Sequence, residues 1–412
     1  MSATPLSTSL DVERAVGERY TRAARTAEAG LCCPVPIDPR RLEAVPEEIL
    51  ARDYGCGDPA AHVHPGEVVI DLGSGAGKAC YLLSQVVGAG GRVIGVDFND
   101  SMLALARAHQ AAFAARLGFD NLRFVKGRVQ DLALDLEALD RWLAAHPVSS
   151  SAGLADAERE ASRLRRDAPL IGDESVDVVV SDCVLNLVRA EDKQRLFGEL
   201  HRVLKRGGRV VISDIVSDEP VSKRLQEDPV LWSGCVSGAL PEVDFLRAFE
   251  DAGFYGIELL DRPATPWRTI DGVEFRSVTV AAYKGKEGPC WDRRQAVLYQ
   301  GPFREVQDDD GHVLRRGVPL AVCDKTFQLY SRSPYAGHVA LVEPLCPVPL
   351  EDARPFDCGA AARARTPRET KGEGYAATSQ TAACCAEGSC VRPGAPAGAP
   401  QRHDMSRGED SD

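Results

Sequence analysis

The chain has 412 residues, enough for two or three domains, and a formal net charge of −12. This acidic balance argues against a nucleic-acid-binding surface, and no apolar stretch approaches the ~18 residues of a membrane span. The N-terminus lacks the apolar core of a secretory signal, so we expect a cytoplasmic protein. Its 13 cysteines are then expected to be reduced thiols that pack, bind metals or do redox chemistry, and not a disulfide framework.

Two helices are predicted before the first strand. The first covers residues 10–23, can be capped through the pattern Thr8-x-x-Asp11, and carries an apolar stripe suited to lying on a sheet. A loop with Cys32-Cys33 leads to the second, over 41–52, which ends at Tyr54-Gly55-Cys56-Gly57. The glycines indicate a mobile loop that could carry the Cys56 thiol to a site, and a packing role for this cysteine fits the pattern equally well.

The strongest signal in the chain is a strand–turn–helix pattern within residues 68–100. Val68 to Ile70 predicts a buried strand, and glycines at 73, 75 and 77 form a tight turn before a helix that Gly90-Gly91 ends. A second strand follows and ends at Asp97. Glycines let the backbone approach a ligand closely, and Asp97 is placed to accept hydrogen bonds from ribose hydroxyls. We therefore favour a nucleotide-type ligand over a purely structural turn.

The rest of this half repeats the alternation of strand and helix. A helix is expected over 102–117, a helical insertion over 132–171, and further strands at 122–125, 176–180 and 210–212, then an antiparallel pair at 256–261 and 274–283. The pattern predicts an α/β fold with a parallel, doubly wound sheet. Ligands bind such sheets at the carboxyl ends of the strands, an edge that collects Asp71, Asp97, Val129, Cys183 and Asp214.

The C-terminal third gives weaker signals. Residues 217–240 form a polar segment in which small residues surround Cys235, so little would shield its sulfur. We expect the first domain to span 1–285 and a small β-rich domain to span 286–348. Residues 349–412 are rich in Ala, Gly, Pro, Arg and Glu and are expected to be disordered; they include Cys384, Cys385 and Cys390.

The turn that starts at Asp71 resembles motif I of the class I S-adenosylmethionine methyltransferases, whose Rossmann-like fold matches the predicted sheet. The cofactor carboxylate would lie at the N-terminus of the following helix. The resemblance implies a cofactor site made of Asp71, Gly73, Ser74, Gly75, Gly77, Asp97, Phe98 and Val129.

Residues from about 10 to 345 resemble the arsenite S-adenosylmethionine methyltransferases. The similar motifs are Tyr54-Gly55-Cys56-Gly57, the segments 181–187 and 234–240, and Leu298 to Gly301; the tail cysteines also occur in animal-type members. The chain departs from the family at Asp182, where Asn is usual, at Gly234, which replaces an acid, and at Ser237, which replaces a glycine. Its 132–171 insertion is also longer than the family's.

The family implies that Cys183 and Cys235 bind trivalent arsenic, helped by Cys56 and by one N-terminal cysteine, for which we prefer Cys33 to Cys32. Arsenic(III) is soft and pairs with thiolates, as soft metals do. Three thiolates would leave its lone pair to face the sulfonium methyl group, so alignment matters more than acid–base catalysis. Two thiols can return the methylated product to arsenic(III) by closing a disulfide, which a cellular thiol such as glutathione or thioredoxin reopens. Arsenite and monomethylarsenite are the expected substrates.

Two other functions compete with this interpretation. A methyltransferase for an ordinary carbon, oxygen or nitrogen acceptor would need a general base or an apolar pocket, and the sequence has no matching constellation. A thiol module that only sequesters zinc or arsenic would have no use for the cofactor turn, and zinc sites favour C-x2-C pairs, which the sequence lacks.

Overall fold

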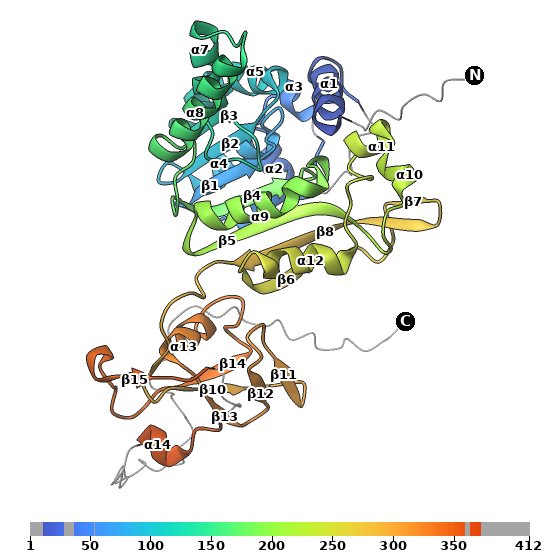
Figure 1. The fold of residues 1–412 in the computed structure, drawn as a ribbon. Helices are drawn as coiled ribbons and strands as arrows, with labels where there is room; N and C mark the ends of the chain where they lie inside the picture. The colour runs from blue at the N-terminus through green and yellow to red at the C-terminus, as the bar shows by residue number, and fades with distance from the viewer. Residues whose placement is uncertain (1–10, 29–36, 53, 359–362, 372–412) are drawn as a thin grey trace, which may run out of the picture.

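The computed structural model describes residues 11–28, 37–52, 54–358 and 363–371, which form a large α/β domain and a smaller β-rich domain (Figure 1). The α/β domain is built on an eight-stranded sheet in the order β3-β2-β1-β4-β5-β8-β6, with β7 paired to β8. The strands are β1 Val68–Leu72, β2 Arg92–Asp97, β3 Leu122–Lys126, β4 Val176–Asp182, β5 Leu204–Ser217, β6 Tyr255–Asp261, β7 Arg268–Ile270 and β8 Val273–Tyr283.

Neighbouring strands among β1 to β5 are parallel, whereas β8 runs antiparallel to both β5 and β6. The sheet is therefore mixed, as expected from a parallel sheet that an antiparallel pair completes. Val69 and Ile70 belong to two separate apolar clusters, because successive side chains of a strand point to opposite faces. A strand covered on both faces needs a continuous apolar run, and this explains the composition of β1.

Helices cover both faces of the sheet (Figure 1). The cluster with Ile70 includes residues of α9 (Ala190–Val203) and α12 (Glu242–Asp251), and the cluster with Val69 includes residues of α4 (Lys78–Val87), α5 (Asp100–Ala108) and α6 (Gln110–Leu117). The 132–171 insertion is confirmed as helical: α7 (Leu136–Ala145) and α8 (Ser151–Asp167) pack on one another.

Several predicted helix boundaries are wrong. In place of one helix over 41–52, residues 39–52 hold two one-turn helices, α2 (Pro39–Leu42) and α3 (Glu47–Leu50), because Pro46 caps the second and has no N–H to continue the first. Helix α4 ends earlier than predicted, at Gly88, whose φ of 65° ends the helix. The predicted helix 102–117 divides at His109 into α5 and α6, a break for which the sequence offers no evident signal.

The C-terminal domain is β-rich, as predicted. Its strands are β9 Trp291–Asp292, β10 Ala296–Tyr299, β11 Glu305–Gln307, β12 Val313–Arg315, β13 Pro319–Ala321, β14 Val339–Val342 and β15 Arg354–Pro355, with α13 at Asp324–Tyr330 and α14 at Pro367–Lys371. Strand β10 lies between β13 and β14, and β9 pairs with β15. Beyond the predicted end at 348, β15 pairs with β9, and the 363–371 segment hydrogen-bonds to residues of this domain.

None of the helices in the described ranges is long and apolar enough to cross a membrane. The tail cysteines Cys384, Cys385 and Cys390 lie outside the described residues, as do Cys32 and Cys33.

Candidate active site

A cavity lies at the carboxyl end of the parallel strands, above the glycine turn. The turn is anchored by hydrogen bonds from the Gly73 and Ser74 amides to the Val96 carbonyl, at 2.8 and 3.1 Å. The Asp97 carboxylate accepts hydrogen bonds from the Gly75 amide (2.8 Å) and the Asn99 amide (2.8 Å). These bonds fix the turn from β1 to α4 against the end of β2, as the sequence predicts for a nucleotide-type cradle.

Seven of the eight predicted cofactor residues line this cavity: Asp71, Gly73, Ser74, Gly75, Asp97, Phe98 and Val129. The exception is Gly77, which caps α4 with a φ of 92°, and a Cβ there would lie 2.8 Å from Phe124. Its role is therefore to shape the turn. The Ser74 hydroxyl oxygen is buried without a hydrogen-bond partner within the described structure, so it can bond to a ligand in the cavity.

Two buried carboxyl groups give the cavity its electrostatic character. Burial raises the pKa of Asp71 to about 7, opposed by a hydrogen bond from the Cys80 thiol. Burial also raises the pKa of Asp97, and backbone N–H donors at Asn99, Gly75 and Phe98 limit the rise. Both groups favour a bound hydrogen-bond donor, which would replace the water that the carboxylates lack.

Helix α1 (Val12–Arg25) closes one side of the cavity, a role that sequence reasoning missed. Its Glu13, Val16 and Tyr20 belong to the lining, and the Asn99 side-chain amide donates to the Gly17 carbonyl at 3.0 Å. The same helix packs on α11 (Pro229–Ser233), where Val12 and Val16 meet Trp232. Helix α1 therefore joins the cofactor edge to the segment that carries Cys235.

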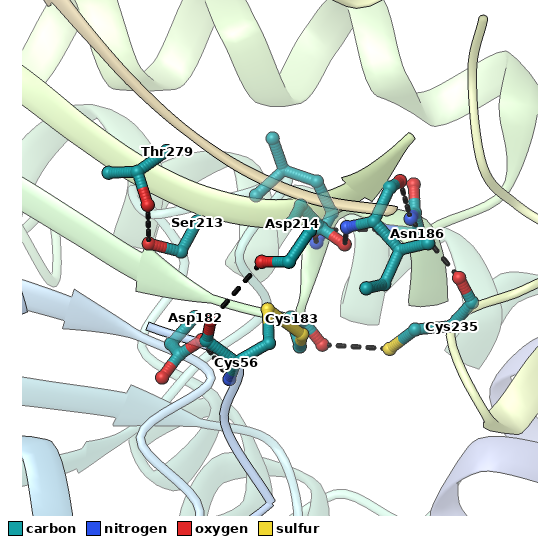
Figure 2. Close-up of a disulfide and its surroundings, with 11 residues drawn as sticks. Cys56, Asp182, Cys183, Asn186, Ser213, Asp214, Cys235 and Thr279 are labelled. Atoms are coloured by element: carbon teal, nitrogen blue, oxygen red, sulfur yellow. Dashed lines mark hydrogen bonds between the residues drawn. A yellow bond between two sulfur atoms is a disulfide. The ribbon is translucent and has the colours of Figure 1, made fainter. Parts of the chain in front are cut away.

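Three cysteines meet beside the cavity (Figure 2). Cys56 and Cys183 form a disulfide with a Cα–Cα distance of 6.0 Å, and the Cys235 thiol donates to the Cys183 carbonyl at 3.0 Å. All three residues are buried, and Cys183 itself lines the cavity. The expectation that the cysteines are reduced is therefore wrong for this pair, because the loop of Cys56 lies directly against the end of β4.

Cys183 and Cys235 both have positive φ angles, 58° and 62°. Non-glycine residues adopt this conformation only where the surrounding structure holds them, and such strain is concentrated at functional sites. Here the Cys183 amide donates to the Ser213 carbonyl at 2.8 Å, and the Cys235 amide donates to the Trp232 carbonyl at 3.0 Å. The two thiols are thus held in place by the backbone.

The glycines beside Cys56 permit close packing against β4 and β5. A Cβ at Gly55 would lie 2.0 Å from the Asp182 carboxylate, and one at Gly57 would lie 2.2 Å from the Ser213 hydroxyl. That carboxylate accepts a hydrogen bond from the Cys56 amide at 2.5 Å. The glycines, interpreted in the sequence as a sign of a mobile loop, thus bring Cys56 within bonding distance of Cys183.

A buried polar network supports the segment of Cys235. The Asn186 side-chain amide donates to the carbonyls of Ile215 (2.6 Å) and Cys235 (3.2 Å). The Lys193 ammonium donates to the Gly238 carbonyl at 2.7 Å. Burial lowers the pKa of Lys193 to about 8, although Asp214 opposes the shift, and burial raises the pKa of Asp214 to about 6. No sequence signal points to Lys193, which lies on α9, a helix of ordinary amphipathic pattern.

The Cys183 sulfur, the Cys235 sulfur and an Asp214 carboxylate oxygen lie within 4.8 Å of one another. The Cys56 sulfur, the Cys183 sulfur and an Asp182 oxygen do so as well. The structure therefore brings together Cys56, Cys183 and Cys235, whereas the predicted contribution of Cys33 falls in the segment outside the described residues. Once the disulfide is reduced, these cysteines present three thiols beside the cavity, and such a set suits a thiophilic atom.

Together, the fold and the glycine-turn cavity define a class I S-adenosylmethionine-dependent methyltransferase. Residues 63–253 match a family described as a methyltransferase domain, and residues 286–375 match a domain of unknown function. The chain is 33% identical to an arsenite methyltransferase from Aquipseudomonas alcaligenes over 76% of its own length and 84% of the relative's. This chain belongs to the arsenite methyltransferase family.

Further arsenite methyltransferases are similar to this chain over most of its length. An arsenite methyltransferase from Mus musculus is 30% identical and is aligned over 74% of each chain, and the one from Homo sapiens is 29% identical over 79% of this chain and 81% of the relative. Among solved structures, an arsenic(III) S-adenosylmethionine methyltransferase from Chlamydomonas reinhardtii is 27% identical, with a TM-score of 0.48 over 79% of this chain and 100% of that chain.

Proposed function

We propose that this protein transfers methyl groups from S-adenosylmethionine to trivalent arsenic held by Cys183 and Cys235, and that it acts in the cytoplasm with a thiol reductant such as glutathione or thioredoxin. Arsenite and monomethylarsenite are the substrates, and the methylated arsenicals are the products of detoxification. The observation that carries the proposal is the position of Cys183. Cys183 lines the cofactor cavity, and its sulfur lies within 4.8 Å of the Cys235 sulfur.

The cavity residues fit the cofactor. Bound S-adenosylmethionine supplies an electrophilic sulfonium methyl group. In our assignment Asp97 accepts hydrogen bonds from the ribose, since each carboxylate oxygen keeps a lone pair beyond its bond to a backbone amide. A Cβ at Gly73 would lie 2.5 Å from the Val184 side chain, so only glycine lets the chain pass this close. Ser74 offers a hydroxyl without a hydrogen-bond partner in the described structure. Phe98 and Val129 provide apolar walls.

The thiol site needs no general base for its chemistry. A thiolate-bound arsenic(III) carries its own lone pair, and the protein contributes alignment by fixing two cysteines in a left-handed backbone conformation. A methyltransferase for an ordinary oxygen or nitrogen acceptor would use a base to remove a proton. The Asp71 carboxyl group accepts a hydrogen bond from the Cys80 thiol of α4, and Asp97 accepts one from the Gly75 amide of the turn, which favours the arsenic acceptor.

The Cys56–Cys183 disulfide supports a redox step inside the cycle. Methyl transfer uses the arsenic lone pair and raises arsenic from the trivalent to the pentavalent state. Two thiols then lose two protons and two electrons, form one disulfide, and return arsenic to the trivalent state. Two equivalents of a cellular thiol, or one dithiol, reduce that disulfide before Cys183 can bind arsenic again. Cys56 is thus assigned as reductant and third ligand, with Cys33 in support.

Product speciation in cysteine variants tests the proposal. Arsenite has three exchangeable positions, whereas monomethylarsenite has two. Cys183→Ser and Cys235→Ser should abolish methylation of both substrates, because a serine hydroxyl is a hard and poorly ionised ligand. Cys56→Ser should lose arsenite methylation and keep activity on monomethylarsenite. The exposed Cys346 supplies the control, Cys346→Ser, which should behave as wild type. Normal monomethylarsenite methylation by Cys183→Ser would refute the binding pair.

A further inference from the structure

We propose that Cys290, Cys323 and Cys358 form a second site for trivalent arsenic, located in the C-terminal domain. Their three sulfur atoms lie within 4.8 Å of one another, and none of the three residues forms a disulfide. The choice of arsenic among soft ions rests on the proposed function. The site itself rests only on the geometry of these thiols.

Strand pairing brings the first two segments together. Cys290 immediately precedes β9, and Cys358 lies three residues beyond β15, its antiparallel partner. The pairing continues past the strands, because the Phe356 amide donates to the Cys290 carbonyl at 2.9 Å. Two cysteines separated by 67 residues of chain thus reach the same place through a backbone ladder.

The third cysteine comes from the start of α13. Cys323 follows β13 and caps the helix, with its sulfur accepting a hydrogen bond from the Thr326 amide at 3.4 Å. It is fully buried, whereas Cys290 and Cys358 are partly exposed. The site therefore combines one buried cysteine with two that are partly exposed to solvent.

Ion pairs hold these segments in register. Arg293, next to β9, donates to Asp324 in the first turn of α13 at 2.9 Å. The buried Arg365 donates to Asp292 at 2.7 Å, and its amide bonds to the Pro319 carbonyl at 2.8 Å. An Arg–carboxylate contact shielded from water is geometrically specific, so the thiols are positioned by the fold before any ligand arrives.

The number of sulfur atoms in the site indicates which ion it binds. Structural zinc is almost always bound by four ligands in a tetrahedron. Within the described ranges, no further cysteine, histidine or carboxylate joins these three sulfurs inside the 4.8 Å span. Trivalent arsenic needs three soft ligands and directs its lone pair away from them. Arsenous acid and three thiols exchange to give three arsenic–sulfur bonds and three waters, with no change of oxidation state.

This second site binds arsenic but does not methylate it. The residues that line the cofactor cavity all belong to the α/β domain, so no methyl donor faces the triad. We therefore infer that the triad stores trivalent arsenic on the enzyme, in a domain whose matching family has no assigned function.

The test uses the full-length chain with the cysteines of the proposed active site, the N-terminal pair and the tail replaced by serine: Cys56, Cys183, Cys235, Cys32, Cys33, Cys384, Cys385 and Cys390. This background should still bind a single arsenic per chain in equilibrium dialysis with arsenite and reductant, with three sulfur neighbours in the arsenic X-ray absorption spectrum. Adding Cys323→Ser should abolish binding, and adding Cys346→Ser should not.

Folding does not confuse this result, because serine is itself a preferred helix cap at position 323. Cys358→Ser, at a partly exposed position, gives an independent second variant. The proposal is overturned if the background binds no arsenic, if Cys323→Ser keeps it, or if zinc displaces arsenic at equal concentration. Methylation by the wild-type chain is measured separately, so the failure of the proposed function would be distinguished from failure of this site.

Discussion

Replacing Asp71 with asparagine should stabilise the protein in the absence of cofactor, increasingly so as the pH rises. Asp71 lies in β1, one residue before its end, as a buried carboxyl group whose pKa burial raises to about 7, from an ordinary value of 3.8. The folded state therefore holds a proton that the unfolded chain has already lost between these two values. Stability falls as the pH rises through this window, and asparagine, which is neutral throughout, removes the dependence.

The size of the effect follows from the shift. A difference of about three pKa units corresponds to about 4 kcal/mol above pH 7, at 1.36 kcal/mol per unit. Most of the window lies between pH 5 and pH 8, so the stability advantage of Asp71→Asn should grow by about 2–3 kcal/mol between these conditions. Part of the gain is offset because the amide accepts a weaker hydrogen bond from the Cys80 thiol, which lies 3.1 Å from the carboxylate.

Urea unfolding of both proteins at the two pH values measures the effect. Asp120→Asn is the control, since this carboxylate lies on the surface and makes one long hydrogen bond, 3.3 Å from the Gln110 amide. An equal stability difference at pH 5 and pH 8 would refute the argument, because the pH dependence is the signature of the raised pKa. The same variant should bind cofactor less tightly, which explains why an enzyme would keep a buried carboxyl group that lowers its folding stability.

Three further predictions concern the glycine turn, the segment 217–240 that carries Cys235, and the C-terminal domain. Asp97→Ala should weaken cofactor binding by about 1.5–3 kcal/mol in calorimetry and leave arsenite binding intact; unchanged affinity would contradict the ribose assignment. Gly238→Ala places a Cβ 2.0 Å from the backbone carbonyl of residue 186, so it should lower stability by about 1–3 kcal/mol and reduce methylation, unlike the unobstructed Gly198→Ala. Truncation after Pro349 removes β15 and the Arg365 ion pair, and limited proteolysis should then cleave the C-terminal domain faster than in the full chain.

The sequence allowed the central sheet to be predicted because each strand signal is local. Val68 to Ile70 is apolar on both faces, the glycines of the turn adopt positive φ angles, and Asp97 ends the next strand. Such signals need no knowledge of distant residues. The break at His109 was missed because no local signal marks it. The end of α4 was misplaced because Gly88 and Gly90-Gly91 are equally plausible ends for a helix.

Contacts between distant segments could not be derived in this way. The motifs indicated that Cys56, Cys183 and Cys235 act together, through resemblance to a family and not through any spacing along the chain. The disulfide joins residues 127 positions apart, and no local pattern encodes such a distance. The position of α1 beside the cavity and the contact of Lys193 with Gly238 likewise depend on how distant segments pack. The Cys290, Cys323 and Cys358 cluster carries no sequence motif at all.

In our two proposals the same thiol chemistry serves different functions, depending on what the lone pair of arsenic faces. At Cys183 and Cys235 the sulfurs adjoin a cavity built from Asp71, Gly73 and Asp97, so a methyl donor can approach the arsenic. The residues that line this cavity do not include Cys290, Cys323 or Cys358. If both proposals hold, removing the triad should leave the methylation rate at saturating arsenite unchanged while lowering the amount of arsenic each chain carries. A triad variant with a lost methylation rate would show instead that the C-terminal thiols take part in the catalytic cycle.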